Sequence, residues 1–265
     1  MECFYPMSTK TKTGKITAVR CGRCKPCLEK KRQDKFIRIL EHSKGYQYTT
    51  FVTLTYDDEN LKWGINPTLC KRDFILFMKK LRKKLSKLNV KISYYTVGEY
   101  GTKFHRPHYH MIIFGLSKAS ATTFIRSTWS NGLIHVGTLS ARSINYVCKY
   151  HVLRGFNPEG TEKCFSLSSK HLGESYVDEM KQWHNEDLLN RYFYHYLDLK
   201  LSLPEYYKQK LYNPRIKELI TNHFIEKNSK KKELIKDFKM DAKQKEIINR
   251  NFTYKNLNNH SSNSF

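Results

Sequence analysis

The chain has 265 residues, of which 39% are hydrophobic and 14% aromatic, so a packed core in one or two domains is possible. No run of 18 apolar residues occurs, and residues 1–10 lack the apolar stretch of a signal peptide, so we expect no membrane span and a cytosolic protein. Lys and Arg number 48 against 24 acidic residues, a net charge of +24. This excess predicts a polyanionic partner, most simply nucleic acid, because each neutralised phosphate releases a counterion.

The aromatic and cysteine contents refine this expectation. The chain contains 18 Tyr and 15 Phe, and aromatic rings beside cations are surfaces on which single-stranded bases stack, although we expect most of these rings in the core. Seven Cys occur in a chain that we expect in a reducing compartment. They are therefore predicted to be thiols or metal ligands and not disulfides.

The first half of the chain alternates between helical and strand-like patterns. Residues 27–42 are typical of a helix, and residues 50–56 (TFVTLTY) are β-branched and aromatic throughout, which is typical of a buried strand. A helix is predicted over residues 67–88. Residues 92–97 and 108–114 are two further strands, which run antiparallel if their connection is short.

The helix over residues 67–88 has two dissimilar faces. Its apolar residues recur at spacings of three and four, and they are Phe74, Phe77, Met78, Leu81, Leu85 and Leu88. The other side carries the cations Lys79, Lys80, Arg82, Lys83, Lys84 and Lys87. We expect this cationic face and the tail after Lys227 to contact phosphates, the alternative being a merely solvated helix face.

The next elements complete an α+β fold. A helix is expected over residues 118–129, a strand over 133–136, and a helix over 144–153 that Ser140 or Ser143 can cap. This order predicts an antiparallel sheet with helices packed on one face.

The domain organisation follows from these patterns. Residues 1–160 are expected to form the α+β core with an N-terminal Cys-rich element, and residues 161–226 a helical extension. Residues 227–265 are expected to be a basic, disordered tail, because Lys, Asn and Ser cannot bury enough apolar surface to order it.

The strongest local motif is His108-Tyr109-His110 within an apolar strand. Strand alternation places His108 and His110 on one face, about 7 Å apart along the chain. Burying an unpartnered polar side chain costs about 1–3 kcal/mol, a cost that a shared metal ion would remove. We therefore predict a metal site, the alternative being paired histidines on a solvated face.

A third ligand is expected from the neighbouring strand. If the chain folds back as a hairpin, Glu99 lies beside the two histidines, whereas His105, a rival ligand, falls in the turn. Two imidazoles and a carboxylate suit a divalent ion with open positions, and they would bind Zn well too.

A second motif is Tyr146-Val147-Cys148-Lys149-Tyr150. On a helix, positions three and four apart share a face, so Tyr146, Lys149 and Tyr150 would stand together. Tyrosine can attack phosphorus and form a covalent phosphotyrosine, and a nearby ammonium can hold the phosphate. Such a pair is more often core packing, and its interest comes from following a histidine pair in a basic chain.

Three segments together resemble the ordered motifs of the HUH endonucleases, most closely the replication initiators of microviruses and of the gokushovirus group: TFVTLTYDDE, GEYGTKFHRPHYHMIIFG and NYVCKY. The segments CGRCKPCLEKKRQ and LPEYYKQKLYN are also similar to parts of those initiators. The resemblance covers about residues 1–215.

The resemblance implies a metal-dependent tyrosine endonuclease. His108, His110 and Glu99 would bind Mg or Mn, Tyr146 and Tyr150 would be the nucleophiles, and residues 52–56 would support the site. One tyrosine would nick the replicative form at a phage origin in the cytoplasm of the bacterial host, and the free 3′ hydroxyl would prime a host polymerase. The second tyrosine would then release and circularise the single strand.

Two alternatives to a replication initiator remain open. A relaxase or transposase of the same HUH class would use the same metal and tyrosines on another DNA substrate. A non-catalytic, zinc-containing nucleic-acid binder would need neither. No G-x-x-x-x-G-K-[ST] loop occurs, so unwinding is expected from another protein, by family analogy a host helicase.

The Cys cluster is a separate feature. Cys21, Cys24 and Cys27 form a C-x-x-C-x-x-C run, and Cys3 could be the fourth ligand of a structural zinc site. An iron–sulfur centre and unliganded thiols are the alternatives.

Overall fold

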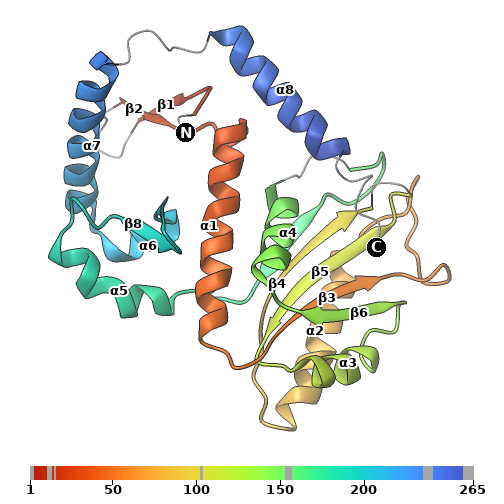
Figure 1. The fold of residues 1–265 in the computed structure, drawn as a ribbon. Coiled ribbons are helices and arrows are strands. Elements are labelled where there is room, and N and C mark those ends of the chain that lie inside the picture. The colour runs from red at the N-terminus through yellow and green to blue at the C-terminus, as the bar shows by residue number, and fades with distance from the viewer. Residues whose placement is uncertain are drawn as a thin grey trace. The chain divides into compact units, whose positions relative to one another are not determined.

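The computed structural model describes residues 3–10, 14, 16–101, 104–152, 157–234 and 241–258, without the side chains of residues 150–152, 228–234 and 253–258 (Figure 1). The chain forms two compact units. One unit comprises Met1–His42 and Gly173–Arg250, and the other comprises Ser43–Leu172 and Asn251–Phe265.

The second unit is built on a five-stranded sheet in the order β6-β3-β5-β4-β7. The pairings are all antiparallel, and helices pack on the sheet (Figure 1), which confirms the α+β fold. The strands are β3 (Thr49–Thr55), β4 (Ser93–Tyr100), β5 (Pro107–Phe114), β6 (Ile134–Thr138) and β7 (Phe165–Ser168).

One face of this sheet packs against α2 (Lys71–Ser86) and α3 (Lys118–Arg126). Alternate residues of the central strands, such as Val52 and Met111, point into this core. The apolar stripe of α2 is buried as predicted, through Phe74, Phe77, Met78, Leu81 and Leu85.

The prediction that α2 runs on to Leu88 is wrong. Asn89 adopts a left-handed conformation with φ of 54°, and the N–H groups of Asn89 and Val90 donate to the carbonyls of Ser86 and Leu85. This arrangement is a Schellman motif, which ends the helix. Leu88 is therefore 58% exposed.

The opposite face of the sheet is covered by α4 (Ala141–Val152). The ring of Tyr146 on α4 contacts Phe51 and His110, which alternate with the residues of the α2 face. Helices therefore lie on both faces and not on one, as the sequence had predicted. Ser140 and Ser143 cap α4 reciprocally, since each backbone N–H donates to the other hydroxyl.

The first unit contains α1 (Lys25–Lys44) and a second, mainly aromatic core. Tyr176 stacks on Tyr207 with ring centroids 4.5 Å apart, and the buried Glu41 accepts a hydrogen bond from the Tyr194 hydroxyl. The other elements between residues 1 and 258 are β1 (Met7–Lys10), β2 (Ile16–Val19), α5 (Ser175–Glu186), β8 (Phe193–Tyr196), β9 (Leu199–Ser202), α6 (Glu205–Leu211), α7 (Pro214–Leu234) and α8 (Ala242–Asn258).

The C-terminal part differs from the prediction in two ways. The expected helical extension over residues 161–226 contains three strands, β7, β8 and β9, each of four residues, too short for a readable alternation. Helices α7 and α8 occupy much of the expected disordered tail, whose residues 259–265 lie outside the described residues. Among the described helices, none is long and apolar enough to cross a membrane.

Candidate active site

His108 and His110 lie on the same face of the central strand β5, as alternation predicted. Their rings are nearly parallel, with an interplanar angle of 11° and centroids 6.2 Å apart. His110 is buried and His108 half-buried. This face of the sheet is the one covered by α4, so the histidine pair faces the helix that carries Tyr146.

Glu99 comes from the adjacent strand β4, which folds back as the predicted hairpin. Glu99 pairs in register with His108, and its Oε1 lies 2.8 Å from Nε2 of His110. The turn needs a glycine, because a Cβ on Gly101 would lie 2.9 Å from Cε1 of His108. The hairpin therefore brings a carboxylate and two imidazoles to one place.

Two threonines hold His110 from the other side. Thr53 is opposite His110 on β3, and its Oγ1 lies 3.0 Å from Nδ1 of the ring. The hydroxyl of Thr96 donates to the His110 carbonyl at 2.9 Å. A metal-binding histidine commonly uses its second ring nitrogen for such a contact, which fixes the ring orientation and the tautomer.

His108 has the properties of a neutral ligand. Burial, with smaller contributions from His110 and Arg106, lowers the pKa of His108 to about 4, so its ring keeps nitrogen lone pairs at neutral pH. Its Nδ1 atom is buried and makes no hydrogen bond within the described part of the chain. A cation would satisfy such a nitrogen, so the donor set fits a divalent ion.

The three ligands are not equally close. Glu99 and His110 are in contact, but the ligand atoms of the trio with His108 do not all fall within 4.8 Å of one another; among the described residues only a group of cysteines meets that spacing. His105, the rival ligand, lies in the β4–β5 connection with φ of 48° and joins no such group there.

Tyr146 stands directly over the histidine pair. Its ring centroid lies 5.1 Å from that of His110 in an edge-to-face arrangement, and its side chain is 37% exposed. It therefore combines access to solvent with contact to a candidate ligand.

Other tyrosines of this unit are unsuited to attack a phosphate. Tyr56 and Tyr109 are buried, and their hydroxyls bond to each other at 2.8 Å. Burial raises the pKa of both far above its usual range. Their network also reaches Asp73 and the backbone of Cys70, which anchors the start of α2 to the sheet.

The rest of the tyrosine motif is only partly described. Tyr150 lies in α4 one turn after Tyr146, but its side chain is outside the described residues. Lys149 is half-buried, three positions after Tyr146 on the same helix.

Three residues near the site were missed from the sequence. Thr53 is one, and His135 on β6 is another, since it pairs with Thr53 and so shares the histidine face while remaining exposed. Arg106 contacts the Tyr56 carbonyl at 3.0 Å and Asp58 at 2.6 Å, which ties the β4–β5 connection to the end of β3. Only His135 had a visible signal, its place in a short apolar strand.

Residues 49–153 match the family model of the ORF2 type of replication-associated protein. This segment runs from β3 through α4 and includes Glu99, both histidines and Tyr146. The resemblance to phage replication initiators is confirmed. The protein is thus related to phage replication proteins over the part of the chain that forms the candidate site.

Individual relatives agree with this assignment. Replication-associated protein VP4 of Bdellovibrio phage phiMH2K is 36% identical over 152 residues, 50% of this chain and 47% of VP4. ORF2 of Spiroplasma virus 4 is 30% identical over 50% of this chain and 47% of its own, and ORF4 of Chlamydia phage 1 is 29% identical over 49% and 37%. Each alignment spans less than half of the relative's length.

The comparison with solved structures is weaker. The N-terminal nuclease domain of minute virus of mice non-structural protein-1 is 15% identical, with 66% of this chain and 73% of that chain covered and a TM-score of 0.19. The fold assignment therefore rests on the sheet itself.

Proposed function

We propose that this protein initiates rolling-circle replication by nicking and rejoining single-stranded DNA at a phage origin through a phosphotyrosine intermediate. The observation that carries the proposal is the half-exposed ring of Tyr146, 5.1 Å from His110, which itself contacts Glu99. A nucleophile, a candidate metal ligand set and solvent access are thereby combined on one face of the sheet.

A divalent ion, Mg or Mn, would be held by His108, His110 and Glu99. When bound, it supplies Lewis acidity that polarises the scissile phosphate and stabilises the developing charge. Thr53 and Thr96 keep His110 oriented toward Glu99. Hard cations with oxygen and imidazole ligands suit this set.

The chemical step is a transesterification. The Tyr146 hydroxyl loses its proton, its oxygen forms a bond to phosphorus, and the bond from phosphorus to the 3′ oxygen breaks. The 3′ oxygen takes up a proton and becomes the free hydroxyl that a host polymerase would extend. The 5′ phosphate remains on the tyrosine, so the ester is conserved for rejoining, and Lys149 is placed on the same helix to neutralise it.

Circularisation needs a second transfer while the first DNA end is still held. Tyr150, one turn along α4, would be the second nucleophile, and a host helicase would supply the unwinding that this chain has no nucleotide-binding loop to drive.

Nucleic-acid binding would use two surfaces. The exposed lysines of α2 lie on the face of the sheet opposite the histidines, so they would hold DNA that extends beyond the cleaved segment. At the end of the sheet near His108, Phe104 is 74% exposed, and Trp63 is 66% exposed in the loop that returns to Tyr100. Such rings offer stacking platforms for unpaired bases.

The alternative functions are separated by their needs. A relaxase or transposase would use the same chemistry, and the replication-associated relatives favour a role in replication. A non-catalytic binder would not need a half-exposed tyrosine against a buried histidine and carboxylate.

A labelled-oligonucleotide assay tests the proposal. Full-length protein should become covalently attached to single-stranded DNA when Mg or Mn is added, and the adduct should map to Tyr146 or Tyr150 by mass spectrometry. Absence of any adduct at the origin sequence, with DNA binding intact, would overturn it.

A further inference from the structure

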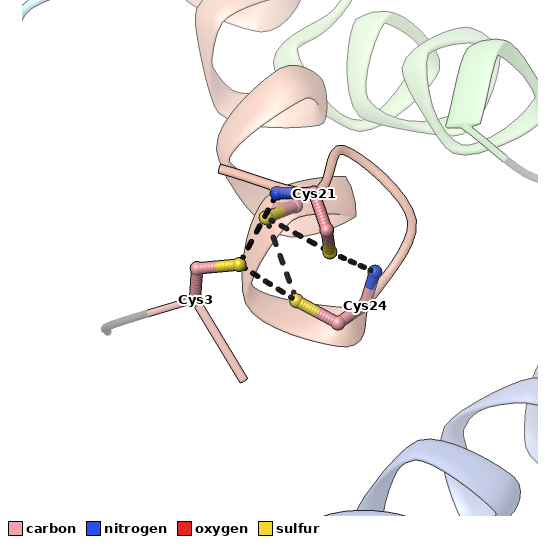
Figure 2. Close-up of side chains that lie close together, drawn as sticks. Cys3, Cys21 and Cys24 are labelled. Carbon is pink, nitrogen blue, oxygen red and sulfur yellow. Dashed lines mark hydrogen bonds between the residues drawn. The ribbon is translucent and has the colours of Figure 1, made fainter. Parts of the chain in front are cut away.

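Four cysteines outside the candidate active site bring their sulfur atoms together. The Sγ atoms of Cys3, Cys21, Cys24 and Cys27 all lie within 4.8 Å of one another. Figure 2 shows the side chains of Cys3, Cys21 and Cys24 turned toward a common point. All four are free thiols, so no disulfide accounts for their approach.

The spacing of the sulfur atoms is that of a single tetrahedral ion. The Cys24–Cys27 distance is 3.4 Å, the Cys3–Cys24 distance 3.8 Å and the Cys21–Cys27 distance 3.9 Å. Zn–S bonds of about 2.3 Å at tetrahedral angles place neighbouring sulfurs about 3.8 Å apart. A disulfide would need about 2.0 Å, and a cluster of several irons holds its cysteines further apart than one ion does.

The local backbone is shaped to present these sulfurs. Gly22 has φ of +73°, a conformation that glycine adopts without strain, and it turns the chain between Cys21 and Cys24. The Cys24 carbonyl accepts the N–H groups of Cys27 and Leu28, which starts α1. Cys27 therefore lies in the first turn, where the helix dipole favours a thiolate.

Backbone N–H groups surround the sulfurs. The N–H of Cys21 points to Cys3 Sγ at 3.3 Å, that of Phe4 to Cys24 Sγ at 3.4 Å, and that of Cys24 to Cys21 Sγ at 3.4 Å. Such contacts from outside the ligand set orient ligands and stabilise negative sulfur.

Positive side chains border the same turn. Arg20 donates to the Pro26 carbonyl at 3.0 Å, and Lys31 donates to the Gly22 carbonyl at 2.9 Å. Arg23 and Lys25 are further cations within the motif. They offset the charge of −2 that four thiolates around one divalent ion carry.

We propose that Cys3, Cys21, Cys24 and Cys27 bind one Zn²⁺ as a structural site that fastens the N-terminal residues to the start of α1. Four protein ligands leave no open position for substrate, which distinguishes this site from the histidine site. Soft thiolates select zinc over Mg or Mn. Each thiol that binds releases its proton to solvent. The proposal is independent of the nuclease activity.

Metal analysis of the full-length protein tests it directly. After dialysis against EDTA to clear exchangeable Mg or Mn, one zinc per chain should remain, and Co²⁺ exchanged into the site should give the thiolate charge-transfer and visible bands of tetrahedral sulfur coordination. Less than half a zinc per chain, or stoichiometric iron in its place, would overturn the proposal.

Ligand variants separate coordination from folding. Cys3→Ser should weaken zinc binding more than about tenfold, the loss expected at minimum when even an outer partner of a metal is removed, and Cys3→His should restore binding with a shifted cobalt spectrum. Cys70→Ser, the same change at a helix N-cap position outside the cluster, should keep the full zinc content. Equal zinc content in Cys3→Ser, Cys24→Ser and unmodified protein would contradict the assignment.

Proteolysis gives a readout that does not depend on activity. Removal of zinc by a strong chelator should speed tryptic cleavage after Arg20, Arg23 and Lys25, while cleavage after Lys87 on α2 should keep its rate. Unchanged cleavage between residues 20 and 25 after zinc loss would refute a fastening role.

Discussion

Glu99 Oε1 and His110 Nε2 lie 2.8 Å apart, although the two residues are on different strands and eleven positions apart in the chain. Register explains the contact, because Glu99 pairs with His108 and Val97 with His110. The carboxylate therefore crosses the hairpin diagonally to reach the more deeply buried histidine, which makes this pair the centre of the candidate metal site.

The first prediction concerns this pair. His110→Ala should abolish nicking, and Glu99→Gln should slow it at least about tenfold, because Gln keeps the shape but loses the charge that attracts a cation. Binding of single-stranded DNA should change less than about twofold, since it rests on Lys and Arg. Nicking rates against Mn concentration, with binding measured in parallel, check this; nicking that persists in EDTA would rule out the metal mechanism.

The second prediction concerns Thr53. Thr53→Val removes the hydroxyl 3.0 Å from His110 Nδ1 while keeping the side-chain shape, and it should reduce nicking about 10–100-fold, the usual cost of losing an outer partner of a metal ligand. The Mn concentration for half-maximal rate should rise. Thr53→Ser should restore both, and Thr55→Val, which faces His108 across the same strands, should have little effect.

The third prediction concerns the lysines of α2. Replacing Lys79, Lys80 and Lys83 by Gln should weaken binding of long DNA and reduce the magnitude of the salt slope by about 0.7 for each single-strand phosphate that is no longer neutralised. Because α2 lies across the sheet from His110, cleavage of a short, saturating oligonucleotide should stay within about twofold. Arg in place of each Lys should preserve the slope, and an unchanged slope in the Gln variant would show a merely solvated face.

The fourth prediction concerns Trp63. If it stacks on bases, Trp63→Ala should lower affinity for single strands about tenfold or more, since each stacked base contributes about 1–3 kcal/mol. Ile65→Ala, in the same loop and 74% exposed, removes a side chain without a π face and should leave affinity unchanged. Fluorescence quenching on binding, absent in Trp63→Ala, measures the stacking. Equal affinities of the two variants would exclude it.

The candidate site was largely predictable because its main signals are local. Alternation placed His108 and His110 on one face, and a short connection placed Glu99 beside them. Thr53 escaped notice because its role depends on the register between β3 and β5, whose paired residues Thr53 and His110 are 57 positions apart. Strand periodicity does not determine register between distant strands.

The parts that could not be predicted have physical causes as well. The four-residue strand β7 is held by its pairing with β4, and so short a segment carries little pattern of its own. The face covered by α4 was also not deducible, since its amphipathic pattern is compatible with packing on either side of the sheet.

The last prediction concerns the two tyrosines of α4. Tyr146→Phe keeps the ring against His110 and Phe51 and removes only the nucleophilic oxygen, so a loss of activity could not be attributed to a cavity. We expect Tyr146→Phe and Tyr150→Phe each to retain some cleavage of a short oligonucleotide, with the double variant inactive. Tyr48→Phe, at a 48% exposed tyrosine near the start of β3, should behave as the unmodified protein.

Joining separates the roles of the two residues further. Two nucleophiles one helical turn apart allow the second transfer while the first DNA end is still bound, so each single variant should lose circularisation while retaining cleavage. A one-tyrosine mechanism would instead need a second subunit or water. If Tyr146 alone proves essential and Tyr150→Phe still circularises DNA, the endonuclease stands but the mechanism becomes that of a one-tyrosine replication protein or transposase. Full activity in the double variant, or an adduct on any other residue, would remove the assignment of α4 as the catalytic helix.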